Sequence, residues 1–103
     1  MPEHVSFFTA RALPRKRGAV VRHFEKWGRE QRRFAKGFLR SVVVVAKNDP
    51  HEVRGVVRFD NSRNYRANAR RPAQDQWHQE LVALLEAPPE WWDGELAGEL
   101  RRR

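Results

Sequence analysis

Cysteine is absent from this 103-residue sequence. Its absence excludes disulfide bonds, thiolate nucleophiles, iron–sulfur clusters and zinc sites built on cysteine. Long apolar runs are missing too, because a run such as Val42–Ala46 falls far short of the ~18 residues that span a membrane. Met1–Ala12 lacks the basic start and apolar block of a signal peptide. We therefore expect a cytoplasmic protein that does not contact a membrane.

Lysine and arginine are missing from residues 72–100, which carry seven acidic residues. Residues 1–71 carry 18 basic and six acidic residues, and the net charge is +8. A basic body of this kind can bind nucleic acid, or the two parts of the sequence can attract each other within or between chains. The arginines are spread over a loop, helix faces and strands. We therefore expect any nucleic-acid binding to be weak, non-specific and lost near physiological salt.

Motifs for phosphate, dinucleotide or nucleophile chemistry are also missing. There is no glycine-rich phosphate loop and no nucleophile elbow around the serines at positions 6, 41 and 62. The histidines at positions 4, 23, 51 and 78 lack metal-ligand spacing, so we predict no metal site. With 40% hydrophobic and 33% charged residues, the sequence is typical of one globular domain. We expect residues 1–103 to form that domain, with an ordered core over about residues 4–100.

The first half of the chain predicts a strand, a helix and a hairpin. His4–Arg11 has the β-branched and aromatic residues of a strand. A helix is expected over Ala19–Ala35, where apolar residues recur at helical spacing and Gly28 indicates close packing or a bend. Strands are expected over Phe38–Ala46 and His51–Phe59, joined by a turn at residues 47–50. The residues that form the predicted buried stripe of the helix are Val20, Phe24, Trp27, Gln31 and Phe34.

The second half predicts two helices and a last strand. Asp60–Ser62 supplies side chains that can cap a short helix over Ser62–Ala69. Pro72 suits the first turn of a helix that continues over Ala73–Leu85. Residues 90–100 are expected to form a turn and a glycine-interrupted strand. The buried face of the longer helix is expected to hold Trp77, Leu81, Leu84 and Leu85.

The element order is therefore β-α-β-β-α-β, which predicts an α+β, ferredoxin-like fold with helices on one face of an antiparallel sheet. Val42–Val45 places valine on both faces of that sheet. The face without helices therefore needs a cover, and the sheet of a second subunit is the expected one. We predict a homodimer that forms through its sheets.

Several segments of the sequence have a familiar pattern. They are Gly37–Leu39, Val42–Val45, Asn48–Pro50, Val56–Tyr65, Arg71–Pro72, Trp77–Leu81 and Trp92–Gly94. Together they resemble the antibiotic biosynthesis monooxygenase family over about Val5 to Leu96. The resemblance implies a dimeric α/β barrel with a pocket in each subunit between the helices and the sheet. Some members of this family oxidise aromatic polyketides with O₂ and need no metal or flavin, and others bind and degrade haem.

A cofactor-free oxygenase must bind a flat aromatic or quinol substrate, remove a proton and stabilise the resulting anion. His78 is a candidate to take the proton, and Tyr65 or Asn68 to donate a hydrogen bond to the substrate oxygen. Three aromatic residues are candidates to enclose the ring, and a basic residue to stabilise the negative charge. These substrate-binding candidates are Trp27, Phe59, Trp77 and Arg11.

Two other functions remain open. His78 falls where haem-degrading members carry their iron-binding histidine, but Asn68 stands at the position of their tryptophan. The first strand has no asparagine near Ala10 or Arg11, so haem degradation fits fewer residues than the cofactor-free reaction does. The same aromatic residues would also fill the core of a non-enzymatic dimer that binds a small ligand or nucleic acid.

Overall fold

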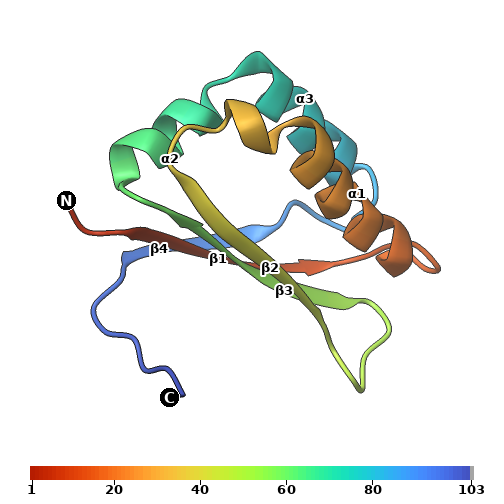
Figure 1. Cartoon of the computed structure of the whole chain (residues 1–103). Helices are drawn as coiled ribbons and strands as arrows, with labels where there is room; N and C mark the ends of the chain where they lie inside the picture. The colour runs from red at the N-terminus through yellow and green to blue at the C-terminus, as the bar shows by residue number, and fades with distance from the viewer. Residues whose placement is uncertain (103) are drawn as a thin grey trace.

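A computed structural model describes residues 1–102 as one sheet covered by helices on a single face (Figure 1). The strands are β1 (His4–Arg11), β2 (Phe38–Val45), β3 (Glu52–Phe59) and β4 (Glu90–Glu95). The helices are α1 (Arg17–Glu30), α2 (Ser62–Ala69) and α3 (Pro72–Val82), with a 3₁₀ turn, η1, over Arg32–Phe34. The strand order is β2-β3-β1-β4, and all paired strands are antiparallel. The predicted α+β, ferredoxin-like fold is therefore confirmed.

The predicted bounds of α1 are wrong at both ends. The helix starts at Arg17 and ends at Glu30, and η1 follows it as a tighter turn. This change of winding carries Phe34 off the buried stripe, so that its side chain is 55% exposed beneath the Arg33 guanidinium. Val20 and Trp27 are buried as expected. A Cβ at Gly28 would meet nothing within 4 Å, so the expectation of close packing there is wrong.

The last two elements are shorter than expected. Helix α3 ends at Val82 rather than Leu85, although Leu85 is still buried. Strand β4 ends at Glu95, which pairs with His4, the first residue of β1. Leu96 N donates one more hydrogen bond, to the carbonyl of Glu3 at 2.9 Å, and residues 97–102 pair with no strand because β1 begins at His4. Residues 96–100 therefore do not form the predicted strand.

Local sequence signals explain how the chain enters α2 and β2. The side chain of Asn61 caps α2 by accepting a hydrogen bond from the backbone N–H of Asn64 at 2.8 Å. Gly37 precedes β2 with a φ of 81°, and a Cβ there would lie 2.2 Å from Oδ1 of Asp60. Only glycine fits this close, left-handed turn without strain.

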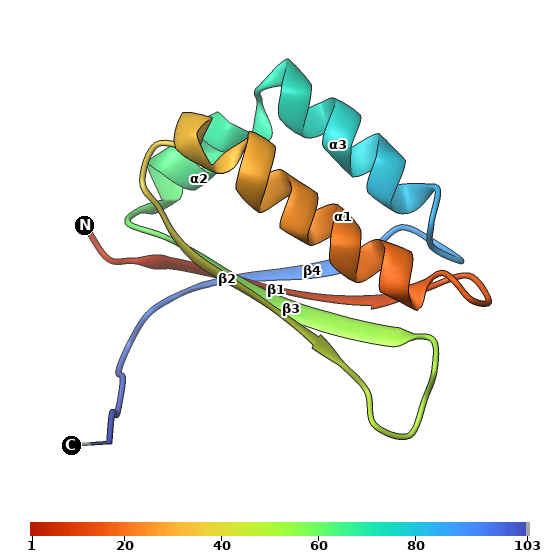
Figure 2. The ribbon, with the colours of Figure 1, turned by 45° about the vertical axis from the view of Figure 1, so that its right-hand side comes forward.

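The two faces of the sheet differ in what covers them. Phe8, Val53 and Phe59 point toward the helices and are buried in the core. The opposite face carries no helix (Figure 2), and Val44 and Trp92 are 55% and 63% exposed there. The valines of β2 therefore face the helices on one side of the sheet and are exposed on the other.

The acidic end of the chain folds back onto the basic part. Glu86 lies 3.5 Å from Arg11, and Glu99 lies 2.9 Å from Arg58. The opposite charges of the two parts therefore attract each other within one chain. No helix in residues 1–102 combines the length and the apolar character needed to cross a membrane.

Candidate functional site

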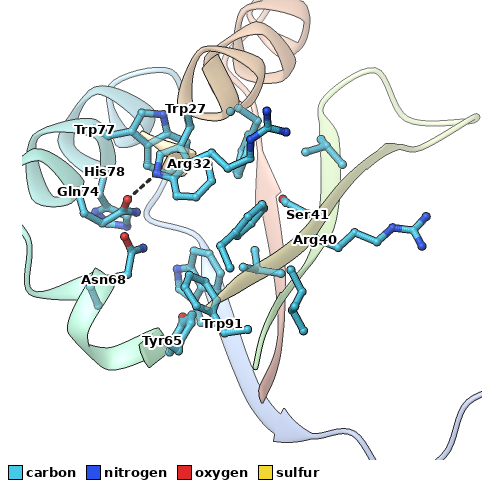
Figure 3. Close-up of a pocket in the computed structure, with 18 of the residues that line it drawn as sticks. Trp27, Arg32, Arg40, Ser41, Tyr65, Asn68, Gln74, Trp77, His78 and Trp91 are labelled. Atoms are coloured by element: carbon cyan, nitrogen blue, oxygen red, sulfur yellow. Dashed lines mark hydrogen bonds between the residues drawn. The ribbon is translucent and has the colours of Figure 1, made fainter. Parts of the chain in front are cut away.

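A cavity of about 870 Å³ lies between the helices and the inner face of the sheet (Figure 3). Its lining comes from α1, η1, α2 and α3 on the helical side and from β2, β3 and β4 on the sheet side. Both edge strands contribute, so the cavity extends across the width of the sheet. The aromatic residues of its wall are Phe24, Trp27, Phe38, Phe59, Tyr65, Trp77 and Trp91.

Hydrogen bonds hold the two tryptophans of the helical wall in place. Trp27 Nε1 donates to Gln74 Oε1 at 2.6 Å, which ties α1 to α3. Trp77 Nε1 donates to the carbonyl of His23 at 3.0 Å, and the His23 ring bonds to the carbonyl of Trp77 at 2.8 Å. The rings of His23 and Trp77 are stacked with centroids 4.8 Å apart. Because the indoles are fixed in this way, the aromatic wall is formed before any ligand binds.

Asn68 presents a hydrogen-bond donor to the cavity. Its side chain is buried, and its Oδ1 accepts a hydrogen bond from Arg71 Nε at 2.9 Å. Arg71 Nη1 also donates to Gln31 Oε1 at 3.1 Å, which fixes the guanidinium between α1 and the start of α3. With its oxygen occupied, the Asn68 amide has its NH₂ group left to donate. That group suits a substrate oxygen that gains negative charge.

His78 lies on the same helical wall of the cavity, one residue after Trp77. Its side chain is half-buried, and Asp75 lines the cavity one turn earlier on α3. Asp75 Oδ2 accepts a hydrogen bond from Gln79 at 2.8 Å. An imidazole at this position can donate or accept a hydrogen bond to a ligand, since one ring nitrogen carries a hydrogen and the other a lone pair.

Tyr65 marks the end of the cavity where α2 meets β1 and β4. Its ring stacks on His4 with centroids 4.0 Å apart and meets the edge of Phe59 at 5.5 Å. Burial raises the pKa of the Tyr65 phenol, and the nearby Asp93 acts in the same direction. Tyr65 therefore stays protonated at neutral pH and can act as a hydrogen-bond donor.

Six of the seven residues singled out in the sequence line this one cavity, and Arg11 does not. Arg11 is the exposed last residue of β1, and its Nη1 donates to Asp49 Oδ2 at 2.7 Å while its Nε lies 3.5 Å from Glu86. Its position does not support a role in substrate binding. The arginines at the cavity are Arg32 and Arg40, from η1 and β2.

Sequence reasoning missed a polar cluster beside Tyr65. His4 and Ser6 are buried on the inner face of β1, and Asp93 lies opposite Ser6 in the pairing of β1 with β4. The spacing of His4 and Ser6 is a signal that both share one face of a strand. Their connection to Asp93 depends on the register of two strands more than 80 residues apart in the chain, which no local pattern gives. Within residues 1–102, no three histidine, aspartate or glutamate side chains are grouped to hold a metal ion.

No family model matches the sequence, and no curated protein matches it. Solved structures do match it. The monooxygenase ActVA-Orf6 of Streptomyces coelicolor, solved with the ligand nanaomycin D, has a TM-score of 0.84 at 21% identity over 99% of this chain and 94% of that one. The chain has the fold of the antibiotic biosynthesis monooxygenases.

Two further structures show the range of proteins with this fold. SnoaB, a cofactor-independent oxygenase from Streptomyces nogalater, has a TM-score of 0.78 at 13% identity and covers 99% of this chain and 100% of its own. NE2512, a protein of unknown function from Nitrosomonas europaea, has a TM-score of 0.76 at 16% identity over 100% of this chain and 98% of its own. At these identities the likeness establishes the fold, and the reaction must be argued from the site.

Proposed function

We propose that this chain is a cofactor-independent monooxygenase of the antibiotic biosynthesis monooxygenase family, acting on a flat aromatic substrate of the polyketide or quinol type. The observation that carries the proposal is the cavity of about 870 Å³, with its aromatic walls and a few polar groups. A cavity of this size and composition is typical of small-molecule sites. The fold shared with ActVA-Orf6 and SnoaB supports the same function.

In the proposed reaction the substrate itself supplies the electrons. A methylene carbon between two aromatic rings, as in an anthrone, loses a proton, and the remaining electron pair forms a bond to O₂. Loss of the second proton from that carbon then breaks the O–O bond. One oxygen atom becomes a carbonyl on that carbon, and the other leaves as water with the two hydrogens. No external reductant is needed, because the ring is oxidised as oxygen is reduced.

The roles of the residues follow from their positions around the cavity. Trp27, Trp77 and Phe59 enclose the flat ring, since aromatic side chains stack on or meet the edge of another ring favourably. Asn68 and Tyr65 donate hydrogen bonds to the oxygen that gains charge after the proton leaves. His78 exchanges protons with the substrate from the α3 wall.

We further propose that the protein works as a cytoplasmic homodimer that joins through the open face of its sheet. The exposed apolar side chains of Phe7, Val42, Val44 and Trp92 support this interface, because isolated monomers rarely leave a large apolar patch in water. Nucleic-acid binding by the arginines is expected to stay weak and non-specific.

The test is O₂ uptake with a panel of anthrones and hydroquinones. We expect turnover by the wild type and a loss of about 100-fold or more in His78→Ala, as is usual for a general acid–base group. Tyr65→Phe should lose less, because it removes one hydrogen bond and keeps the ring. Gln76→Ala is the matched control, since Gln76 lies on α3 outside the large cavity.

The alternatives predict different results in this assay, in a haem titration and in a nucleic-acid binding measurement. No uptake with any compound would overturn the monooxygenase proposal and favour a binding module. Turnover that appears only with haem, together with a Soret band on titration, would favour haem degradation. Tight binding to DNA or RNA at ~150 mM salt would favour the basic surface as the functional site.

A further inference from the structure

A chain of hydrogen bonds leads from the buried side of β1 to the cavity wall on β4. Ser6 Oγ donates to Asp93 Oδ1 at 2.5 Å, and His4 Nε2 lies 2.7 Å from Ser6 Oγ. The other ring nitrogen of His4 lies 3.0 Å from the hydroxyl of Ser62 at the start of α2. His4 is 5% exposed and Ser6 is completely buried. Three elements, β1, β4 and α2, therefore meet in one polar array beside Tyr65.

The direction of each hydrogen bond follows from the carboxylate. Ionised Asp93 can only accept, so the hydroxyl of Ser6 uses its hydrogen there. The oxygen of Ser6 then accepts a hydrogen from His4 Nε2, and His4 Nδ1 accepts from Ser62. This arrangement fixes the tautomer of His4 and holds one oxygen of Asp93 in a defined place.

The second oxygen of Asp93, Oδ2, is available to a ligand in the cavity. Asp93 lines the cavity, and its side chain is 59% exposed although its Oδ1 accepts a hydrogen bond from Ser6. Within residues 1–102, Oδ2 makes no hydrogen bond to another side chain. A carboxylate with one oxygen anchored and one free has the geometry of a positioned base.

We propose that Asp93 is a catalytic residue that accepts the proton of a substrate hydroxyl, with Ser6 and His4 as its positioning residues. This inference rests on the proposed function and adds a second proton-active group to it. A new O–H bond forms at Asp93 Oδ2 as the substrate O–H bond breaks, and the electron pair stays on the substrate oxygen. Tyr65, next to Asp93 in the cavity wall, can then donate to that oxygen.

Asp93 and His78 act on different parts of the substrate because they lie on different walls of the cavity. Asp93 belongs to the sheet and His78 to α3, so a flat ring between helices and sheet meets both. Burial lowers the pKa of His4, and the nearby Arg66 adds to this, while Asp93 and Glu95 act in the opposite direction. A neutral His4 adds no positive charge beside the Asp93 carboxylate.

The test uses a binding preference, which does not depend on turnover. Affinities of a hydroxynaphthoquinone and of its methyl ether are measured by quenching of tryptophan fluorescence, since Trp27, Trp77 and Trp91 line the cavity. A hydrogen bond to a charged group contributes about 1.5–3 kcal/mol, so the wild type should prefer the hydroxyl compound by about 10- to 100-fold. Asp93→Ala should lose the preference, and Ser6→Ala should reduce it while both compounds still bind.

The control is Glu95→Ala, which removes the same charge two residues away on β4 but outside the cavity. It should keep the wild-type preference. Equal binding of the two compounds by the wild type, or an unchanged preference in Asp93→Ala, would overturn the role of Asp93 and leave the cavity as a ligand site. Failure of both compounds to bind would overturn the proposed function together with this inference.

Discussion

Gly28 provides a sharp test of the cavity, because it lies on α1 at the cavity wall and has open space where a side chain would start. Alanine is about 0.8–1 kcal/mol better than glycine inside a helix. A Cβ at this position meets nothing within 4 Å, so no steric cost offsets the gain. Gly28→Ala should therefore stabilise the protein by up to about 1 kcal/mol.

The matching contrast is Gly37→Ala. At Gly37 the φ of 81° is left-handed, and a Cβ would lie 2.2 Å from Asp60 Oδ1. The backbone alone costs about 1–2 kcal/mol for a residue other than glycine. Gly98→Ala should change little, because its Cβ also meets nothing and it lies outside the helices and strands.

Thermal unfolding at one fixed protein concentration measures all three variants. Stabilisation by Gly28→Ala should raise Tm by about 4–8 °C per kcal/mol, and Gly37→Ala should lower it. A larger substitution, Gly28→Leu, should remain folded and weaken hydroxynaphthoquinone binding, because its side chain enters the cavity. Destabilisation by Gly28→Ala, or full binding by Gly28→Leu, would refute an open cavity at this wall.

Three further predictions concern other parts of the molecule. Asn61→Ala should lower the free energy of unfolding, measured with urea, by about 1 kcal/mol, because it removes the cap of α2. Asn61→Asp should keep most of the wild-type stability, because aspartate can also cap the helix. Equal stability of the wild type and both variants would contradict the capping role. Because the pKa of His4 is lowered by burial, the unfolded chain binds more protons, and stability should fall as pH drops below about 6.5. His4→Gln should flatten that fall, and an unchanged pH dependence would count against it. Val44→Lys should shift sedimentation equilibrium toward monomer if the sheet forms the dimer, whereas Lys47→Ala in the hairpin turn should not.

The fold was predictable from sequence where local patterns control it. The β-branched run of β2 and the turn at residues 47–50 give the hairpin, and Asn61 signals the start of α2. Most of the candidate residues of the cavity were also predictable from sequence, because Trp27 and Trp77 fall on the inward faces of their helices. Periodicity alone indicates which side of an element is buried.

The rest of the site depends on contacts between distant parts of the chain. Ser6 meets Asp93 only because β1 and β4 pair in one register, and a shift of one residue would turn Asp93 to the other face. Arg11 was a candidate to stabilise negative charge in the cavity, but it is the last residue of β1 and bonds to Asp49 outside the cavity. Phe34 left the buried stripe because the helix ends at Glu30, where no proline or glycine marks the change.

The most direct test of the central claim follows the two atoms of O₂. Purified protein stripped with a chelator is incubated with an anthrone under isotopically labelled O₂, and the product and the released water are analysed by mass spectrometry. The proposed reaction predicts one labelled oxygen atom in the product carbonyl, one in water and no hydrogen peroxide. Product carrying no labelled oxygen, or one equivalent of hydrogen peroxide per turnover, would contradict a monooxygenase.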